Sequence, residues 1–202
     1  MSSPFSVHSH QSYLRHMASP YQTDILVPQR PYAANIQRNH THSIGVVEFW
    51  VNGQKGIRLS DAQARAFSGL AQADDRLLEG FGTKVTYRIE WPGYVAFGKQ
   101  KHALRATREK ESITRAKMAI HVAEVMKDFI DEMGPLPTSD PHWRVGQGFI
   151  EFGDLYLLEI HHVAKASLQP VLAFRPRYYP QQSTPSPPST AAYPAYHSYA
   201  WP

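Results

Sequence analysis

The chain contains no cysteine among its 202 residues. A disulfide framework, a thiolate zinc or iron–sulfur site and a cysteine nucleophile are therefore excluded, and the hydrophobic core alone has to stabilise the fold. No run approaches the roughly 18 apolar residues that a membrane span requires. The first 21 residues carry Pro, Ser and His in place of the apolar segment of a signal peptide. We therefore expect an intracellular protein, of cytoplasm or nucleus, that does not bind membranes.

Proline and charge divide the chain into three parts. Residues 1–43 contain four prolines and five of the eleven histidines, and residues 174–202 contain seven prolines, five tyrosines and no acidic residue. We expect both to be disordered tails, with the folded domain over residues 44–173. Each tail carries a net charge of +2, which accounts for the whole +4 of the chain. The domain is neutral, so the basic composition is weak support for a nucleic-acid-binding fold.

The patterning of the domain predicts an α+β fold: a single compact domain with two β-hairpins, an alternating antiparallel strand and two main helices. Asn52-Gly53 lies between two apolar runs and is typical of a type I′ turn, which predicts the first hairpin over residues 46–59. We expect the second hairpin over residues 149–163, with its turn at Gly153-Asp154.

Two further strands are indicated by apolar residues. Residues 84–91 alternate without a fault, so one face of this strand should be buried. That face consists of Val85, Tyr87, Ile89 and Trp91. The last strand is expected over residues 168–174, where Pro170 indicates a position at the edge of the sheet.

Side chains that can cap a helix indicate where the two helices begin. Ser60 and Gln63 have the spacing of a capping box and predict the first helix. Its apolar face would consist of Ala66, Phe67, Leu70 and Ala71. Ser112 is expected to cap the second, long helix over residues 113–133, which carries an apolar stripe and ends before Gly134-Pro135.

The domain also contains three distinctive short segments: Trp91-Pro-Gly-Tyr94, Ile113-Thr-Arg-Ala-Lys117, and Trp143-Arg-Val-Gly146 leading into residues 155–169. Together they resemble a pattern in an uncharacterised protein family of mushroom-forming fungi. The resemblance covers roughly residues 45–173 and neither tail. It implies a fungal origin and assigns no activity, ligand or site residue.

Positive charge is densest between residues 99 and 117. Seven lysines and arginines occur there with two glutamates, a local net charge of +5 (7 − 2). The cations could contact phosphates while nearby aromatic rings stack on bases. The candidate partner-binding residues are Lys99, Gln100, Lys101, Arg105, Arg108, Trp91 and Tyr94. A solvated linker is the competing interpretation, and no helix-turn-helix, RNP or zinc-finger pattern is present.

An enzymatic interpretation depends on three histidines, His121, His142 and His161. His121 is expected on the polar face of the long helix, and the three could meet in space as an acid/base or metal-binding triad. His161 and His162 are adjacent on a strand and should point to opposite faces. The motifs of P-loops, Rossmann folds, serine hydrolases and zinc peptidases are absent. We predict neither a metal nor a cofactor.

These observations favour a non-enzymatic interaction module that binds a protein partner, or alternatively nucleic acid, through the basic segment 99–117. The rival is an enzyme of unrecognised type with a histidine-containing site. An enzyme needs polar groups that converge in a pocket, whereas a binding module needs an exposed surface. The surroundings of the three histidines therefore distinguish the two.

Overall fold

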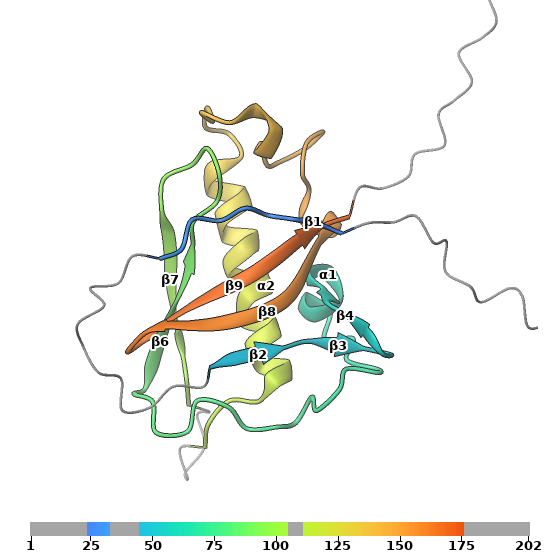
Figure 1. The fold of residues 1–202 in the computed structure, drawn as a ribbon, viewed down its shortest axis with the longest axis vertical. Coiled ribbons are helices and arrows are strands. Elements are labelled where there is room, and N and C mark those ends of the chain that lie inside the picture. The colour runs from blue at the N-terminus through green and yellow to red at the C-terminus, as the bar shows by residue number, and fades with distance from the viewer. Residues whose placement is uncertain (1–23, 33–44, 105–110, 176–202) are drawn as a thin grey trace, which may run out of the picture.

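A computed structural model describes residues 24–32, 45–104 and 111–175 of the chain. These residues form a sheet packed against one long helix (Figure 1). The α+β prediction is confirmed. In chain order the elements are β1 (Ile25–Leu26), β2 (Val46–Glu48), β3 (Trp50–Val51), β4 (Gln54–Lys55), β5 (Ile57–Arg58), α1 (Leu59–Gln63), β6 (Lys84–Ile89), β7 (Phe97–His102), α2 (Arg115–Met133), η2 (Pro141–Trp143), η3 (Phe152–Asp154), β8 (Leu155–Ala164) and β9 (Ser167–Phe174).

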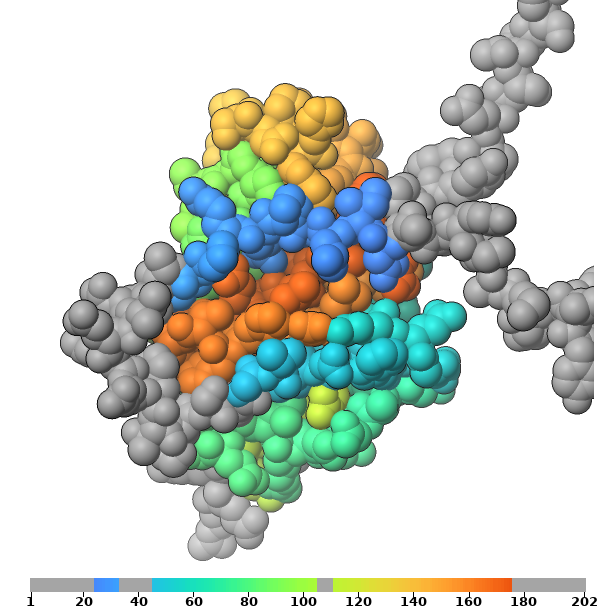
Figure 2. Space-filling model, viewed as in Figure 1, coloured from blue at the N-terminus to red at the C-terminus, as the bar shows by residue number. Residues whose placement is uncertain are grey.

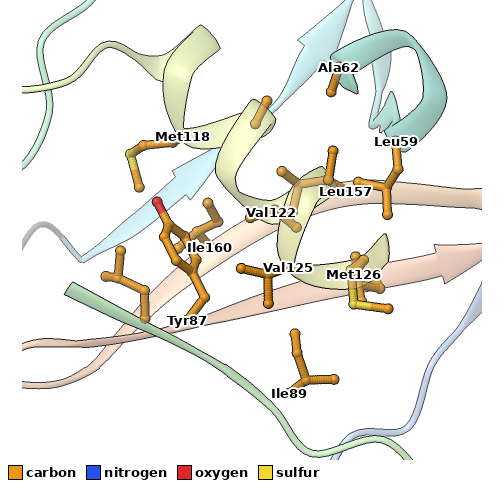
Figure 3. Packing of buried hydrophobic residues seen from close by; sticks show 14 of the residues in the cluster. Leu59, Ala62, Tyr87, Ile89, Met118, Val122, Val125, Met126, Leu157 and Ile160 are labelled. Carbon is orange, nitrogen blue, oxygen red and sulfur yellow. The ribbon is translucent and has the colours of Figure 1, made fainter. Parts of the chain in front are cut away.

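The main sheet has the order β2-β8-β9-β6-β7, with β1 paired to β9 and β5 paired to β8. Strand β6 is antiparallel to β7, as predicted, but parallel to β9 on its other side. Its alternation is confirmed over residues 84–89, since Val85, Tyr87 and Ile89 are buried while Lys84 is exposed. The strand ends at Ile89, and Glu90, expected on the solvated face, is buried. Helix α2 covers one face of the sheet (Figure 1), and Tyr87 and Ile89 point toward it (Figure 3).

The core lies between α2 and the covered face of the sheet (Figure 3). Strands contribute Tyr87, Ile89, Leu157 and Ile160, all fully buried. The opposing residues are Met118, Val122, Val125 and Met126 of α2 and Leu59 and Ala62 of α1. Burial of each large side chain contributes roughly 1.5–3 kcal/mol, so this layer supplies most of the stability.

The expected tail boundary at residue 44 differs from the structure, because residues 24–32 are part of the sheet. Ile25 and Leu26 pair with β9, and the Val27 side chain is buried. Gln29 then bridges two strands: its Nε2 donates to the Pro170 carbonyl (2.6 Å) and its Oε1 accepts the Glu90 N–H (3.0 Å). The segment has too few apolar residues to show a period, which is why composition placed it in a tail.

Pro170 occupies a central strand, so the predicted edge position is wrong. Strand β9 has β8 on one side along its whole length. The Pro170 carbonyl points away from β8 toward Gln29, and the nitrogen of a strand residue points to the same side as its carbonyl. The missing N–H therefore faces the gap that Gln29 fills between β6 and β1, and no ladder bond to β8 is lost.

The Asn52-Gly53 turn is confirmed, but its hairpin is short. Both residues have positive φ (50° and 78°), as a type I′ turn requires. Only β3 and β4 pair with each other, while the flanking β2 and β5 both pair with β8. The two arms of the predicted hairpin separate because each one hydrogen-bonds to the same longer strand.

The second predicted hairpin, over residues 149–163, is wrong. Residues 152–154 form η3, whose start has a reciprocal capping box between Glu151 and Asp154. This local hydrogen bonding ends the extended chain before β8 begins. Strand β8 forms its hairpin with β9 instead, across residues Lys165-Ala166.

Helix α1 differs from its prediction at both ends. It begins at Leu59, so Ser60 lies inside the helix and makes no capping bond. It ends after Gln63, because Arg65 adopts a left-handed conformation (φ 59°) that a helix cannot continue. Phe67 and Leu70 of the predicted apolar face therefore lie outside the helix, and Leu70 forms an isolated β-bridge with Val51.

Helix α2 ends at Met133 as predicted but begins two residues later than expected. Its N-cap is Thr114, whose side chain accepts the Lys117 N–H (3.2 Å). The predicted cap, Ser112, pairs with Leu104 in an isolated β-bridge. Thr114 also forms an isolated β-bridge, with Arg76, so the chain stays extended up to the N-cap and turns into the helix at Arg115.

Candidate functional site

The two lysines of the basic segment that lie on β7 are ion-paired with α2. Lys99 Nζ lies 2.7 Å from Glu132 Oε1, and Lys101 Nζ lies 2.9 Å from Glu124 Oε2. The hydrogen bond to Glu132 raises the pKa of Lys99. Their charges are thus directed to the helix and neutralised there. Arg105 and Arg108, the other candidate cations, lie outside the described residues.

Trp91 and Tyr94 are buried, so the prediction that their rings stack on bases is wrong. Trp91 Nε1 donates to the Trp143 carbonyl (2.7 Å), and Tyr94 Oη accepts the Val145 N–H (3.3 Å). Both rings also pack on Phe129 of α2. The Trp91–Tyr94 segment and the Trp143–Gly146 segment, two of the three distinctive segments, therefore pack together as part of the core.

Beside Lys101 a cleft of about 950 Å³ opens between β7 and the N-terminal half of α2. The strand side is lined by Gln100, Lys101 and His102, and the helix side by Lys117, Ile120, His121 and Glu124. These helix residues are three or four positions apart, or adjacent, and form one stripe along α2. Leu104 and Ile113 add apolar lining, and Arg65 adds a further cation.

His121 lies at the inner wall of this cleft and is only 4% exposed, so its predicted position on the polar face of the helix is wrong. Burial, reinforced by the charge of Lys117, lowers its pKa to about 4. The imidazole is therefore neutral at pH 7, and its Nδ1 lies 3.4 Å from Tyr87 Oη. Burial also raises the pKa of Tyr87, so that hydroxyl keeps its proton.

The remaining charges of the cleft leave two cations unpaired. Burial alone would raise the pKa of Glu124, but the hydrogen bond from Lys101 and the charges of Lys101 and Lys117 outweigh it and lower the pKa. In the described part of the chain, neither Lys117 nor Arg65 is ion-paired. Among the lining residues that the structure describes, Asp74 is the one other acid, and together these residues carry a net charge of +1 (Arg65, Lys101 and Lys117 minus Asp74 and Glu124).

The three histidines of the enzymatic interpretation are not brought together. Ile160 points toward α2, so the next residue, His161, points to the opposite face of the sheet, where its Nε2 lies 2.7 Å from Glu159 Oε2. His142 lies in η2, and its backbone N–H donates to Asp140. No group of three or more potential metal-ligating side chains occurs among residues 24–32, 45–104 and 111–175.

The adjacent histidines of β8 do diverge as predicted. The His162 ring packs edge-on against Phe81, with 4.8 Å between ring centroids. His161 instead lines a smaller groove of about 470 Å³ beside the N-terminal segment. Figure 2 shows this face, with residues 24–32 in blue beside β8 and β9 in orange. The groove is mostly apolar, lined by Leu26, Pro28, Pro31, Tyr32, Val163 and Val171.

The cleft beside β7 is a site that the sequence located only in part. The basic segment pointed to Gln100, Lys101 and the region of Lys117, but not to the helix residues His121 and Glu124. A histidine among the apolar positions of α2 was the available signal, since Met118, Val122 and Val125 surround it in the sequence.

Among the described residues, no helix is both long enough and apolar enough to span a membrane. In comparisons with known proteins, no family model, no curated protein and no solved structure matches this chain.

Proposed function

We propose that this chain is a non-enzymatic interaction module that binds an acidic segment of a protein partner in the cleft between β7 and α2. The observation that carries the proposal is the pair of cations, Lys117 and Arg65, that line the cleft without an ion pair in the described part of the chain. A carboxylate of a partner would complete these pairs, and the apolar side chains of Leu104, Ile113 and Ile120 would contact its neighbours.

Two observations favour a protein over nucleic acid. Lys99 and Lys101 are already paired with α2, so they add little to phosphate binding. Trp91 and Tyr94 have no exposed ring face on which a base could stack. The enzymatic alternative is weakened by the separation of His121 from His161, which lie on opposite faces of the sheet.

The test is a selection of random twelve-residue peptides displayed on phage against the full chain. We expect the selected peptides to be enriched in Asp and Glu. For the most enriched peptide, Lys117→Glu should weaken binding roughly tenfold or more in calorimetry, because an attractive charge becomes a repulsive one. Lys165→Glu is the matched control: it makes the same change of charge in the exposed β8–β9 turn and should leave the affinity unchanged.

Two outcomes would contradict the proposal. If the selected peptides contained no acidic residues, or if Lys117→Glu and Lys165→Glu reduced the affinity equally, the cleft would not be the binding site for an acidic segment. The protein could instead bind single-stranded poly(U) at about 50 mM salt and no acidic peptide. If Lys117→Glu weakened that binding, the cleft would be a nucleic-acid site.

A further inference from the structure

We infer that the acidic partner segment binds as an added β-strand along the outer edge of β7. The inference rests on the proposed function and names its binding mode. Strand β7 is the end of the main sheet and, within the part of the chain described, pairs only with β6. It has six residues, whereas β2 at the other end has three. An edge strand of this length presents a row of backbone donors and acceptors to an extended peptide.

The register of β7 identifies which backbone groups point outward. The Ala103 N–H donates to the Thr83 carbonyl (2.9 Å), so the pair before it, His102 and Lys84, is a non-hydrogen-bonded pair of the ladder. Because hydrogen-bonded and non-hydrogen-bonded pairs alternate in an antiparallel ladder, Lys99 and Lys101 also bond to β6. The N–H and carbonyl groups of Gly98, Gln100 and His102 therefore face away from β6.

The cleft lies along this same edge. Side chains of consecutive strand residues point to opposite faces, yet Gln100, Lys101 and His102 all line the cleft, so it wraps around the edge of β7. The stripe of α2 from Lys117 to Glu124 forms its other wall. An extended segment at the edge would direct every second side chain toward this stripe and the others toward solvent.

Charge favours an acidic peptide over a second copy of this chain at the edge of β7. A second copy of β7 carries no acidic residue, so it would supply no carboxylate for Lys117. A strand with alternating acidic residues instead places carboxylates beside Lys117. The structure thus fits an acidic extended segment better than a β7–β7 dimer.

The experiment uses the full chain and a capped ten-residue peptide in which Glu alternates with Val. Amide hydrogen exchange, followed residue by residue by NMR, should slow at least tenfold for Gly98, Gln100 and His102 at saturating peptide. The amides of Lys99 and Lys101 already bond to β6, so their exchange should change much less. No binding of this peptide, or equal protection along the whole strand, would overturn the inference.

Two variants of this experiment test the backbone contacts directly. Gln100→Pro and Gln100→Ala both remove the amide side chain, but only Gln100→Pro also removes the outward N–H, and neither removes a bond to β6. Gln100→Pro should therefore weaken binding about tenfold more than Gln100→Ala. On the unchanged protein, peptides N-methylated at every Glu or at every Val should differ, because only one set of peptide amides faces β7. We expect one of the two to lose at least tenfold in affinity while the other binds normally.

The outcomes separate the binding mode from the proposed function. If Lys117→Glu weakens the peptide but neither methylated peptide loses affinity, the cleft binds acidic segments by their side chains and strand addition is wrong. If the peptides selected from the phage library contain no acidic residues, the proposed function itself fails.

Discussion

The buried histidine of the cleft makes the stability of this protein depend on pH in a predictable window. The pKa of His121 is about 4 in the folded chain and about 6.5 in the unfolded chain. Between these values the unfolded state binds the proton and the folded state does not, so stability falls as the pH falls. Above pH 6.5 the imidazole is neutral in both states and costs nothing.

The size of the effect follows from the two pKa values. Each unit of pKa difference corresponds to about 1.4 kcal/mol, and at pH 4.5 the folded state has only begun to take up the proton. We therefore expect the free energy of unfolding to fall by about 2–3 kcal/mol between pH 7 and pH 4.5 because of His121 alone. Burial is the largest cause of this low pKa. Of the charged groups that face the imidazole, Lys117, Lys101 and His102 oppose its protonated form, and Glu124 favours it.

Urea unfolding at pH 7, 5.5 and 4.5 measures this loss. His121→Gln cannot titrate, so its stability should be flatter over the same range, and the difference between wild type and variant isolates the histidine. His142→Gln removes an exposed histidine and should retain the wild-type pH dependence. If wild type and His121→Gln lose stability in parallel, the imidazole is not buried in its neutral form and our account of the inner wall of the cleft is wrong.

Three further predictions concern the sheet, each measured by equilibrium or thermal unfolding. Ile89→Ala should cost about 2–5 kcal/mol because the side chain is fully buried, whereas Arg88→Ala should cost less than about 1 kcal/mol; equal losses would mean that the faces of β6 are misassigned. Gln29→Ala should cost about 1–3 kcal/mol because it leaves two backbone groups without partners, and a neutral result would mean that water replaces the amide. Deletion of residues 1–32 should lower the melting temperature by roughly 10 °C, and deletion of residues 1–23 by less than about 2 °C; similar effects would show that residues 24–32 do not stabilise the sheet.

Local features of the sequence predicted those elements whose geometry is determined by neighbouring residues. The alternation in residues 84–91 specified both the strand and its buried face, because the side-chain period of a strand depends only on its backbone. Asn52-Gly53 specified its turn because few residue pairs adopt two consecutive positive φ angles. In both cases no distant partner was needed.

Partner choice between distant segments was not predictable in this way. Pro170 argued for an edge because a proline has no N–H. In the structure Gln29, 141 residues earlier in the chain, lies beside Pro170 on that side of the strand and donates to its carbonyl. Similarly, Ser112 and Thr114 are both competent caps, and the helix begins only after two bridges to distant residues, Ser112 with Leu104 and Thr114 with Arg76. The sequence shows each side chain but not the contacts that compete for it.

The ion pairs of the candidate site were equally unpredictable from the sequence. A local count of charge between residues 99 and 117 treats every lysine as available, yet Lys99 and Lys101 find their carboxylates 33 and 23 residues further along the chain. Exposed pairs of this kind contribute at most about 1 kcal/mol each, so they do not determine where α2 packs. Burial of the apolar residues of α2 places the helix, and that placement brings the acids to the lysines. Among the described residues, Lys117 and Arg65 are cations of the cleft that the packing of the core leaves without an ion pair.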